Sequence, residues 1–320
     1  MFVIEKENGT PTFSVKIAYC MIATTVLLWS IGVVVARGVH DEIPLIGLTF
    51  WRWVIAGLFL APFVWREIYE NIEIIRDNWR IYLAQGTFMV GGGTLLFTSL
   101  YFTSAINAAL VNTTQPAITA LLAWVILKDR LKNIQYAGIA SAIAGVIFMI
   151  ARADVKVLVN FDFNIGDFIV VLAIVSYSMY AINLRKVPTG LGTFPTLFVI
   201  IVFGTFPLLP FYVGETILVK PFPFSVMSFA WASVLAIVIS IGSLALWNNG
   251  NRIVGPQRAA VFVSLMPVFG SILAMTFLGE ELYLYHIGGA FLICAGIFMV
   301  VKNHQTKVGN IKSSNDKVFL

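Results

Sequence analysis

Residues 108–131 read AALVNTTQPAITALLAWVILKDRL, and residues 259–282 read AAVFVSLMPVFGSILAMTFLGEEL. At a shift of 151 positions the two stretches share an Ala-Ala pair, a proline near the middle and two leucines toward the end. Both are mostly apolar over about 20 residues, the length that a helix needs to cross the hydrocarbon of a bilayer. The pair therefore predicts two membrane helices that are copies of one another, each with a proline inside it.

The rest of the chain has the composition of a membrane protein. Hydrophobic residues make up 59% of the 320 residues and charged residues 12%, whereas a soluble domain has roughly 45–50% and about 25%. The apolar runs are continuous rather than alternating, which predicts helices and excludes an outer-membrane barrel. We predict an all-α polytopic membrane protein with ten transmembrane helices, at residues 16–36, 45–64, 79–101, 105–127, 134–151, 164–183, 194–213, 226–247, 257–278 and 283–301.

The repetition extends to the first half of each copy. At a shift of 148 positions, Trp29-Ser30 aligns with Tyr177-Ser178. Each copy holds five predicted helices, and because five is odd the two copies cross the membrane in opposite directions. This is the inverted-repeat architecture of many secondary transporters. The predicted parts are a first five-helix repeat at 16–151, a second at 164–302 and a polar tail at 303–320.

Positive charge predicts the orientation. With the N-terminus in the cytoplasm, sixteen of the 21 Lys and Arg residues lie inside, four lie outside and Arg52 lies within a predicted helix. Cytoplasmic loops carry the excess of basic residues in membrane proteins. We therefore predict that both termini, including the tail, are cytoplasmic and that the chain lies in the inner (plasma) membrane. Because the basic residues are explained by topology, the net charge of +5 gives no reason to expect nucleic-acid binding.

With these motifs the chain resembles the drug/metabolite transporter superfamily, in the form built from two EamA domains. The resemblance covers about 16–302, and its first copy has Lys-Asp-Arg-Leu at 128–131 where the family often has Gly-Glu-x-Leu. Known members mostly export amino acids, related metabolites or drugs. The resemblance implies transport of a small molecule without fixing which one. It is carried by Trp29, Arg37, 50–52, Ala56, 108–109, Pro116, 255–260, Pro267 and 279–282.

Two prolines mark the candidate substrate cavity. Pro116 and Pro267 lie near the middle of their predicted helices, and each removes an N–H donor and disrupts the bond to residue i−4. Irregular backbone at this depth must find partners or line a cavity, so either a tolerated kink or a cavity wall is expected. Polar and aromatic neighbours complete the candidate set: Trp29, Ser30, Asn112, Gln115, Pro116, Thr119, Tyr177, Tyr180, Asn183, Trp247, Ser264 and Pro267.

Each of these residues also has a purely structural interpretation. Buried amides and hydroxyls often serve as hydrogen bonds between membrane helices, and Trp247 is typical of an anchor at the membrane interface. Arg52 has two readings as well. Its side chain can reach out to the interface, or it can contact an anion such as a substrate carboxylate.

The distribution of acids and histidines limits the mechanism. None of the 16 Asp and Glu residues falls near the middle of a predicted helix, so we expect flux down the substrate gradient rather than proton coupling, with Asp167 at a helix end the one acid left open. Three scattered histidines and two cysteines in apolar runs predict no metal, cofactor or disulfide. We predict a transporter that works by alternating access. The alternatives are a multi-span enzyme or a passive channel, and a homodimer is left open.

Overall fold

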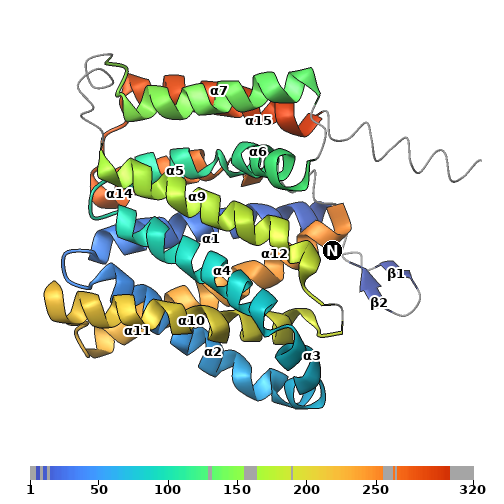
Figure 1. Cartoon of the computed structure of the whole chain (residues 1–320). Helices are drawn as coiled ribbons and strands as arrows, with labels where there is room; N and C mark the ends of the chain where they lie inside the picture. The colour runs from blue at the N-terminus through green and yellow to red at the C-terminus, as the bar shows by residue number, and fades with distance from the viewer. Residues whose placement is uncertain are drawn as a thin grey trace, which may run out of the picture.

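The structure, a computed structural model, describes residues 5–7, 10–12, 15–128, 132–154, 164–188, 190–254, 262–263 and 265–302. Figure 1 shows long helices lying side by side. The first repeat holds α1 (Val15–Val39), α2 (Leu45–Glu70), α3 (Ile72–Asp77), α4 (Trp79–Ser99), α5 (Ala105–Asn112), α6 (Gln115–Leu127) and α7 (Asn133–Ile150). The second holds α9 (Ile165–Asn183), the 3₁₀ turn η1 (Leu184–Lys186), α10 (Thr193–Leu218), α11 (Val226–Val234), the π-helix η2 (Leu235–Gly242), α12 (Ser243–Val254), α14 (Met266–Leu278) and α15 (Leu284–Lys302).

The prediction of a helical, polytopic membrane protein is confirmed. By length and hydropathy, six helices in the described part of the chain can cross a membrane, or seven if the bent pair α5–α6 counts as one. The helices α14 and α15 are apolar but shorter, and most of 257–265, the start of the predicted ninth helix, lies outside the described residues. The count of ten therefore stays a prediction. Two small elements were not predicted: α3, and an antiparallel pair of strands, β1 (Glu5–Glu7) and β2 (Thr10–Thr12).

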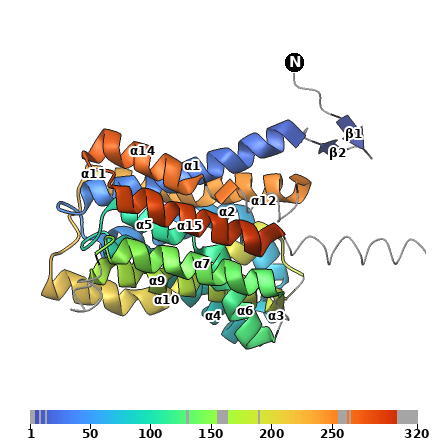
Figure 2. The same ribbon diagram turned by 90° about the horizontal axis from the view of Figure 1, so that it is seen from above.

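Close glycine contacts join the two repeats. The helices α7 and α15 pack side by side in both views (Figures 1 and 2). A Cβ atom on Gly145 would lie 2.8 Å from the carbonyl oxygen of Gly289, and one on Gly296 would collide with the carbonyl oxygen of Gly138. Only glycine allows backbones to approach this closely in a membrane helix pair. These glycines therefore allow the close contact between α7 and α15.

The helices equivalent in the two repeats pack on equivalent partners. The helix α1 lies against α12 and α14, whereas α9 lies against α4 and α6. The helices α2 and α10 are antiparallel neighbours, because Glu215 near the end of α10 accepts from the N–H of Gly47 near the start of α2. Conversely, Glu67 near the end of α2 accepts from the N–H of Gly192, the residue before α10.

Both copies contain a helix interrupted at the predicted proline. The helices α5 and α6 are bent by 42° at the break. The helix α6 begins at Gln115 and α14 at Met266, so each helix has its proline in its first turn. There the missing N–H is one that a helix leaves unbonded in any case. The ends also match, because Lys128 after α6 and Gly279 after α14 both have left-handed backbones, with φ of 57° and 65°.

Candidate functional site

The two helix breaks meet inside the bundle. The side-chain N–H of Asn112, the last residue of α5, lies 3.5 Å from the sulfur of Met266, the first residue of α14. The hydroxyl of Ser30 on α1 donates to the carbonyl of Val26 at 3.0 Å and lies 3.5 Å from that of Met266. The structure therefore brings together Ser30, Asn112 and the start of α14, where Pro267 is buried. The predicted site residue Ser264 lies outside the described residues.

One polar atom at this meeting point has no hydrogen-bond partner. The side-chain oxygen of Asn112 is buried, and none of the described residues donates to it. A buried acceptor left unsatisfied costs roughly 1–3 kcal/mol. This cost at the junction of two broken helices is explained if the oxygen of Asn112 accepts a hydrogen bond from a substrate. This is the feature of the breaks that most favours a binding role over a tolerated kink.

An aromatic pair lies beside the π-helix. The indole N–H of Trp29 donates to the hydroxyl of Ser243 at 3.0 Å, and the ring of Trp29 lies 5.2 Å from that of Trp247. The hydroxyl of Thr25 also reaches the carbonyl of Ser243 at 3.2 Å. Trp247 is half-buried and packs beside Ala18 and Ile22. Trp247 therefore packs within the bundle, which favours a platform over an interface anchor.

Thr119 joins α6 to α9 in the same region. Its hydroxyl donates to that of Ser178 at 2.9 Å, and Gln115 and Pro116 are half-buried at the start of α6. Two further predicted residues lie elsewhere on α9. Tyr180 packs against the apolar cluster between α2, α4 and α10, and Asn183 is half-buried at the C-terminal end of the helix.

Arg52 does not reach out to the membrane interface. Its side chain is buried, with the residue 9% exposed. Its Nε donates to the hydroxyl of Ser240 at 2.7 Å. The guanidinium carbon lies over the faces of Trp53 at 4.7 Å and Phe97 at 5.1 Å. The interpretation of Arg52 as a side chain extended to the surface is therefore wrong, because packing between α2, α4 and η2 holds it inside.

Tyr177 approaches Arg52 across two glycines of α4. A Cβ atom on Gly92 would lie 3.3 Å from the ring of Tyr177, and one on Gly93 would lie 3.2 Å from its hydroxyl and 3.9 Å from Trp53. Trp53 in turn lies beside the guanidinium of Arg52, with its ring centroid 4.7 Å from the central carbon. Gly92 and Gly93 therefore let Tyr177 pack closely against α4, where Tyr177, Trp53 and Arg52 share one neighbourhood.

The sequence analysis did not single out the residues that connect these parts. Ser240 lies on the π-helix, a rare form that is frequent at functional sites. Its hydroxyl donates to the carbonyl of Leu235 at 2.7 Å, which leaves the oxygen free to accept from Arg52. The hydroxyl of Ser243 lies 3.3 Å from the carbonyl of Ser240, so Arg52 is linked to Trp29 through two serines. The signal in the sequence was a pair of polar residues three positions apart in an apolar run.

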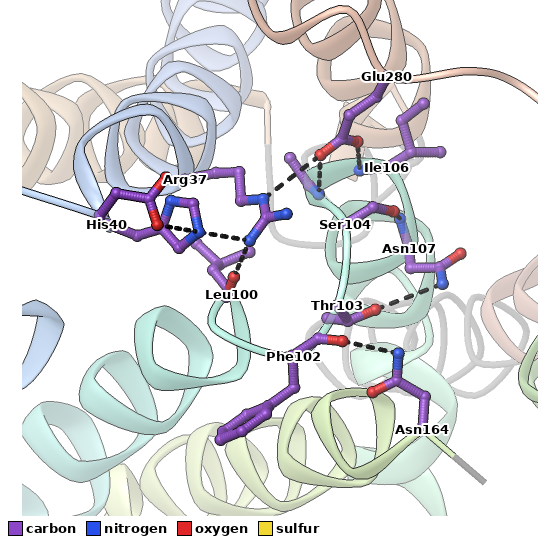
Figure 3. A network of polar contacts seen from close by, with 12 residues as sticks. Arg37, His40, Leu100, Phe102, Thr103, Ser104, Ile106, Asn107, Asn164 and Glu280 are labelled. Atoms are coloured by element: carbon purple, nitrogen blue, oxygen red, sulfur yellow. Dashed lines mark hydrogen bonds and ion pairs between the residues drawn. The ribbon is translucent and has the colours of Figure 1, made fainter. Parts of the chain in front are cut away.

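A second polar network closes one end of the bundle (Figure 3). Glu280, in the loop after α14, accepts from the N–H groups of Ala105 at 2.7 Å and Ile106 at 2.9 Å, and so caps the N-terminus of α5. Its carboxylate lies 3.8 Å from Arg37, which also contacts His40 at 2.9 Å and donates to the carbonyl of Leu100. A carboxylate at a helix N-terminus is stabilised by the helix dipole and by the free N–H groups. We call this side of the molecule the Glu280 end.

A relay of side chains continues from this network. The Nε2 atom of His286 lies 2.9 Å from the side-chain oxygen of Asn107. Its Nδ1 atom accepts a hydrogen bond from the backbone N–H of Tyr283 at 2.9 Å. The amide of Asn107 donates to Thr103 at 3.3 Å, and Thr103 donates to Asp167. Because Nδ1 accepts, the bonding pattern fits a neutral ring that donates from Nε2. The relay ties α15, α5 and α9 together with buried polar groups.

Glu215 makes the matching cap for α2 at the same end. Its carboxylate accepts from the N–H groups of Ile46 at 3.2 Å and Gly47 at 2.7 Å and lies 3.4 Å from the hydroxyl of Tyr101. The hydroxyl of Tyr101 accepts from the N–H of Leu45 at 2.8 Å. Burial in this turn raises the pKa of Tyr101 to about 12. Glu215 was expected in a loop after residue 213, but α10 continues through Leu218 and buries it.

The comparisons agree with the architecture. The sequence matches the EamA-like transporter family over residues 16–151 and again over 164–302. An uncharacterized transporter of Bacillus subtilis (strain 168), YyaM, is 25% identical over 254 residues, 77% of this chain and 81% of that protein. An uncharacterized transporter of Archaeoglobus fulgidus is 22% identical over 293 residues, 90% of this chain and 98% of the other. One solved crystal structure has a similar fold, with a TM-score of 0.56 and 18% identity over 88% of this chain and 95% of that one.

Proposed function

The chain belongs to the EamA-like transporter family, and on that premise we propose that it exports amino acids or related small organic metabolites across the inner (plasma) membrane by alternating access. Because the family is one of transporters, the protein is a multi-pass membrane transporter and the enzyme alternative falls away. The observation that carries the proposal is the meeting of the two helix breaks at Asn112 and Met266. Secondary transporters bind their substrates between repeats, beside interrupted helices near the midplane.

The cross-capping of α2 and α10 supports ten membrane helices in two inverted repeats. Glu67 and Glu215 are separated by the repeat shift of 148 positions. Each accepts from a backbone N–H at the start of the other's helix. Two equivalent helices that run in opposite directions are what an inverted repeat requires. The proposed repeats occupy 16–151 and 164–302, and the tail 303–320 follows them.

We propose that both termini lie in the cytoplasm. The asymmetry of basic residues supports this orientation. The start of α1 and the end of α15 also lie at the same end of the bundle in Figure 1. Reporter fusions at the C-terminus should behave as cytoplasmic, and an external signal from that position would reverse the orientation.

Net flux is proposed to follow the substrate gradient. The acids buried in the described part of the chain include Asp167 and Glu215, and both lie at the Glu280 end rather than beside the helix breaks. A proton carrier is commonly a buried acid on the substrate path. The test is net efflux from substrate-loaded liposomes with and without a pH step. Accumulation against the gradient that a protonophore abolishes, and that Asp167→Asn removes, would replace this mechanism with proton coupling.

Counterflow in proteoliposomes tests transport itself. The full chain is reconstituted, and exchange of each of the common radiolabelled amino acids is measured separately. We expect saturable exchange of at least one of them, reduced several-fold by Pro116→Ala or Pro267→Ala with normal yield of folded protein. Pro62→Ala is the matched control, because Pro62 is also inside a helix but is exposed and remote from the breaks. Unsaturable, high-conductance flux would favour the passive channel, and unchanged exchange in both variants would reduce the breaks to structural kinks.

A further inference from the structure

Arg52 is a buried cation with no counter-ion among the described residues. No carboxylate of the described residues lies within ion-pair distance of it. Its Nε is bonded to Ser240, and none of the described residues accepts from Nη1 or Nη2. Charged side chains inside membrane segments are costly, and they are generally paired or face a pathway for ions or substrates. The free end of this guanidinium therefore needs an explanation that the described residues do not supply.

The neighbours of Arg52 add donors but no acceptor for its free end. The indole N–H of Trp53, a side chain 6% exposed, is buried and has no partner among the described residues. The hydroxyl of Tyr177 makes no hydrogen bond within the described part of the chain and points to the same place beside Gly93. We call Arg52, Trp53, Phe97, Tyr177 and Ser240 the Arg52 cluster. Three of its members hold unused donors in one neighbourhood, which is the complement of an anion.

The free end of the guanidinium selects the shape of that anion. The central carbon of the guanidinium lies over the rings of Trp53 and Phe97, 4.7 Å and 5.1 Å from their centroids. Ser240 occupies the Nε side of the guanidinium. The remaining edge presents Nη1 and Nη2 as a planar fork, which matches the two oxygens of a carboxylate.

We propose that the Arg52 cluster is the subsite for a carboxylate group of the transported molecule, so that the substrates of this protein are organic carboxylates. This inference rests on the proposed function, because it assigns the chemistry of the substrate to the same transport path. Two serines connect the cluster to Trp29, and Tyr177 precedes Ser178, which contacts α6 beyond the break. At the breaks, Asn112 offers an acceptor for another part of the molecule.

Acetate is the probe for this subsite. Thermal unfolding of the purified full chain in detergent is followed with sodium acetate, with sodium chloride at equal ionic strength, and with acetamide, the neutral molecule of nearly the same shape. We expect acetate alone to raise the Tm by a few degrees in a saturable manner, since a ligand that binds only the folded state stabilises it. Arg52→Gln should weaken the apparent affinity for acetate at least tenfold. Arg66→Gln on the same helix should not change it, because Arg66 is exposed and paired with Glu70.

A second variant separates binding from folding. Removing an unpaired buried charge relieves a desolvation cost, so Arg52→Met should leave the Tm in chloride unchanged or higher while abolishing the response to acetate. A large fall in its Tm would show that Arg52 is structural and overturn the proposal. An equal response to acetamide, a response retained in Arg52→Gln, a preference for inorganic phosphate, or no response to acetate would overturn it as well. This experiment measures no transport, so an Arg52-dependent response to acetate supports the subsite even if the counterflow experiment fails. If counterflow succeeds and acetate gives no Arg52-dependent response, the subsite is rejected and the proposed transport function is not.

Discussion

Glu67 and Glu215 occupy equivalent positions in the two repeats, yet their surroundings differ. Glu215 is 6% exposed and accepts from the backbone of Ile46 and Gly47, with the hydroxyl of Tyr101 beside it. Glu67 is only half-buried and, among the described residues, accepts from Gly192 alone. We call the side of the bundle that holds Glu67 the Glu67 end. The two equivalent glutamates therefore make a buried helix cap at one end of the bundle and a weaker, half-buried cap at the other.

The interrupted helix of the first repeat shows the same difference. Every residue of α5, which lies toward the Glu280 end, is buried. In α6, which leads to the Glu67 end, Ala117 is buried and the other described side chains are partly or fully exposed. Together with the Glu280 network, this indicates a conformation closed at the Glu280 end. With the proposed orientation, that is the state closed to the outside. An alternating-access cycle must break the Glu280 network and form a seal at the Glu67 end.

The largest effect is expected at Glu280. In Glu280→Gln one carboxylate oxygen becomes an amide that cannot accept from the N-terminus of α5, and the attraction to Arg37 is lost. Hydrogen bonds to charged groups contribute about 1.5–3 kcal/mol. We expect counterflow to fall at least tenfold, because the state closed at this end is less populated.

The neighbouring acid provides the control for that experiment. Glu281→Gln changes a carboxylate that is exposed and bonded to the hydroxyl of Tyr283. It should leave counterflow near the wild-type rate. Equal loss in the two variants would mean that loop charge, rather than the cap on α5, controls transport.

The difference between the two equivalent glutamates gives a smaller effect. Glu215→Ala leaves the N–H groups of Ile46 and Gly47 without their acceptor in a buried place, so the free energy of unfolding should fall by about 2 kcal/mol. Glu67→Ala should cost less than about 1 kcal/mol, because water can reach the N–H of Gly192. Thermal unfolding of both variants in one detergent measures the difference. Equal shifts in Tm would contradict the inference that the two ends are sealed differently.

Features that depend on local sequence, such as the helix breaks, were predictable. Features that depend on residues distant in the sequence, such as the position of a buried side chain, were not. The prolines located both breaks, since α6 and α14 each begin one residue before their proline. The shift of 148 also relates Glu67 to Glu215. The equivalence was missed because the apolar run ends at residue 213, whereas α10 continues to Leu218. The position of Arg52 was undecidable from the sequence, because reaching the surface or staying inside depends on Trp53, Phe97 and Ser240.

The chemistry of the candidate site was predicted only in part. The sequence pointed to Ser30, Asn112 and Pro267, which the structure gathers at the breaks, and to Tyr177, which lies against Gly93 near Trp53. It gave no sign of the π-helix, because the spacing of residues in an apolar helix does not reveal a local change of period. Ser240 was therefore missed as the partner of Arg52.

The smallest effect compares the ends of the two interrupted helices. Lys128 and Gly279 are equivalent and both left-handed, a conformation that costs a residue with a Cβ atom roughly 1 kcal/mol. A Cβ atom on Gly279 would meet nothing within 4 Å, so Gly279→Ala should lower the free energy of unfolding by about that amount through the backbone alone. Lys128→Gly should have the opposite sign and a smaller size, because relief of strain is partly offset by the greater freedom of glycine in the unfolded chain. Chemical unfolding of both variants in detergent decides the sign. Counterflow with Gly279→Ala serves as the check, because Glu280 directly follows this residue. A loss of counterflow like that of Glu280→Gln would mean that the turn at Gly279 positions the cap on α5. Normal counterflow with lower stability would confine the effect to the backbone of Gly279.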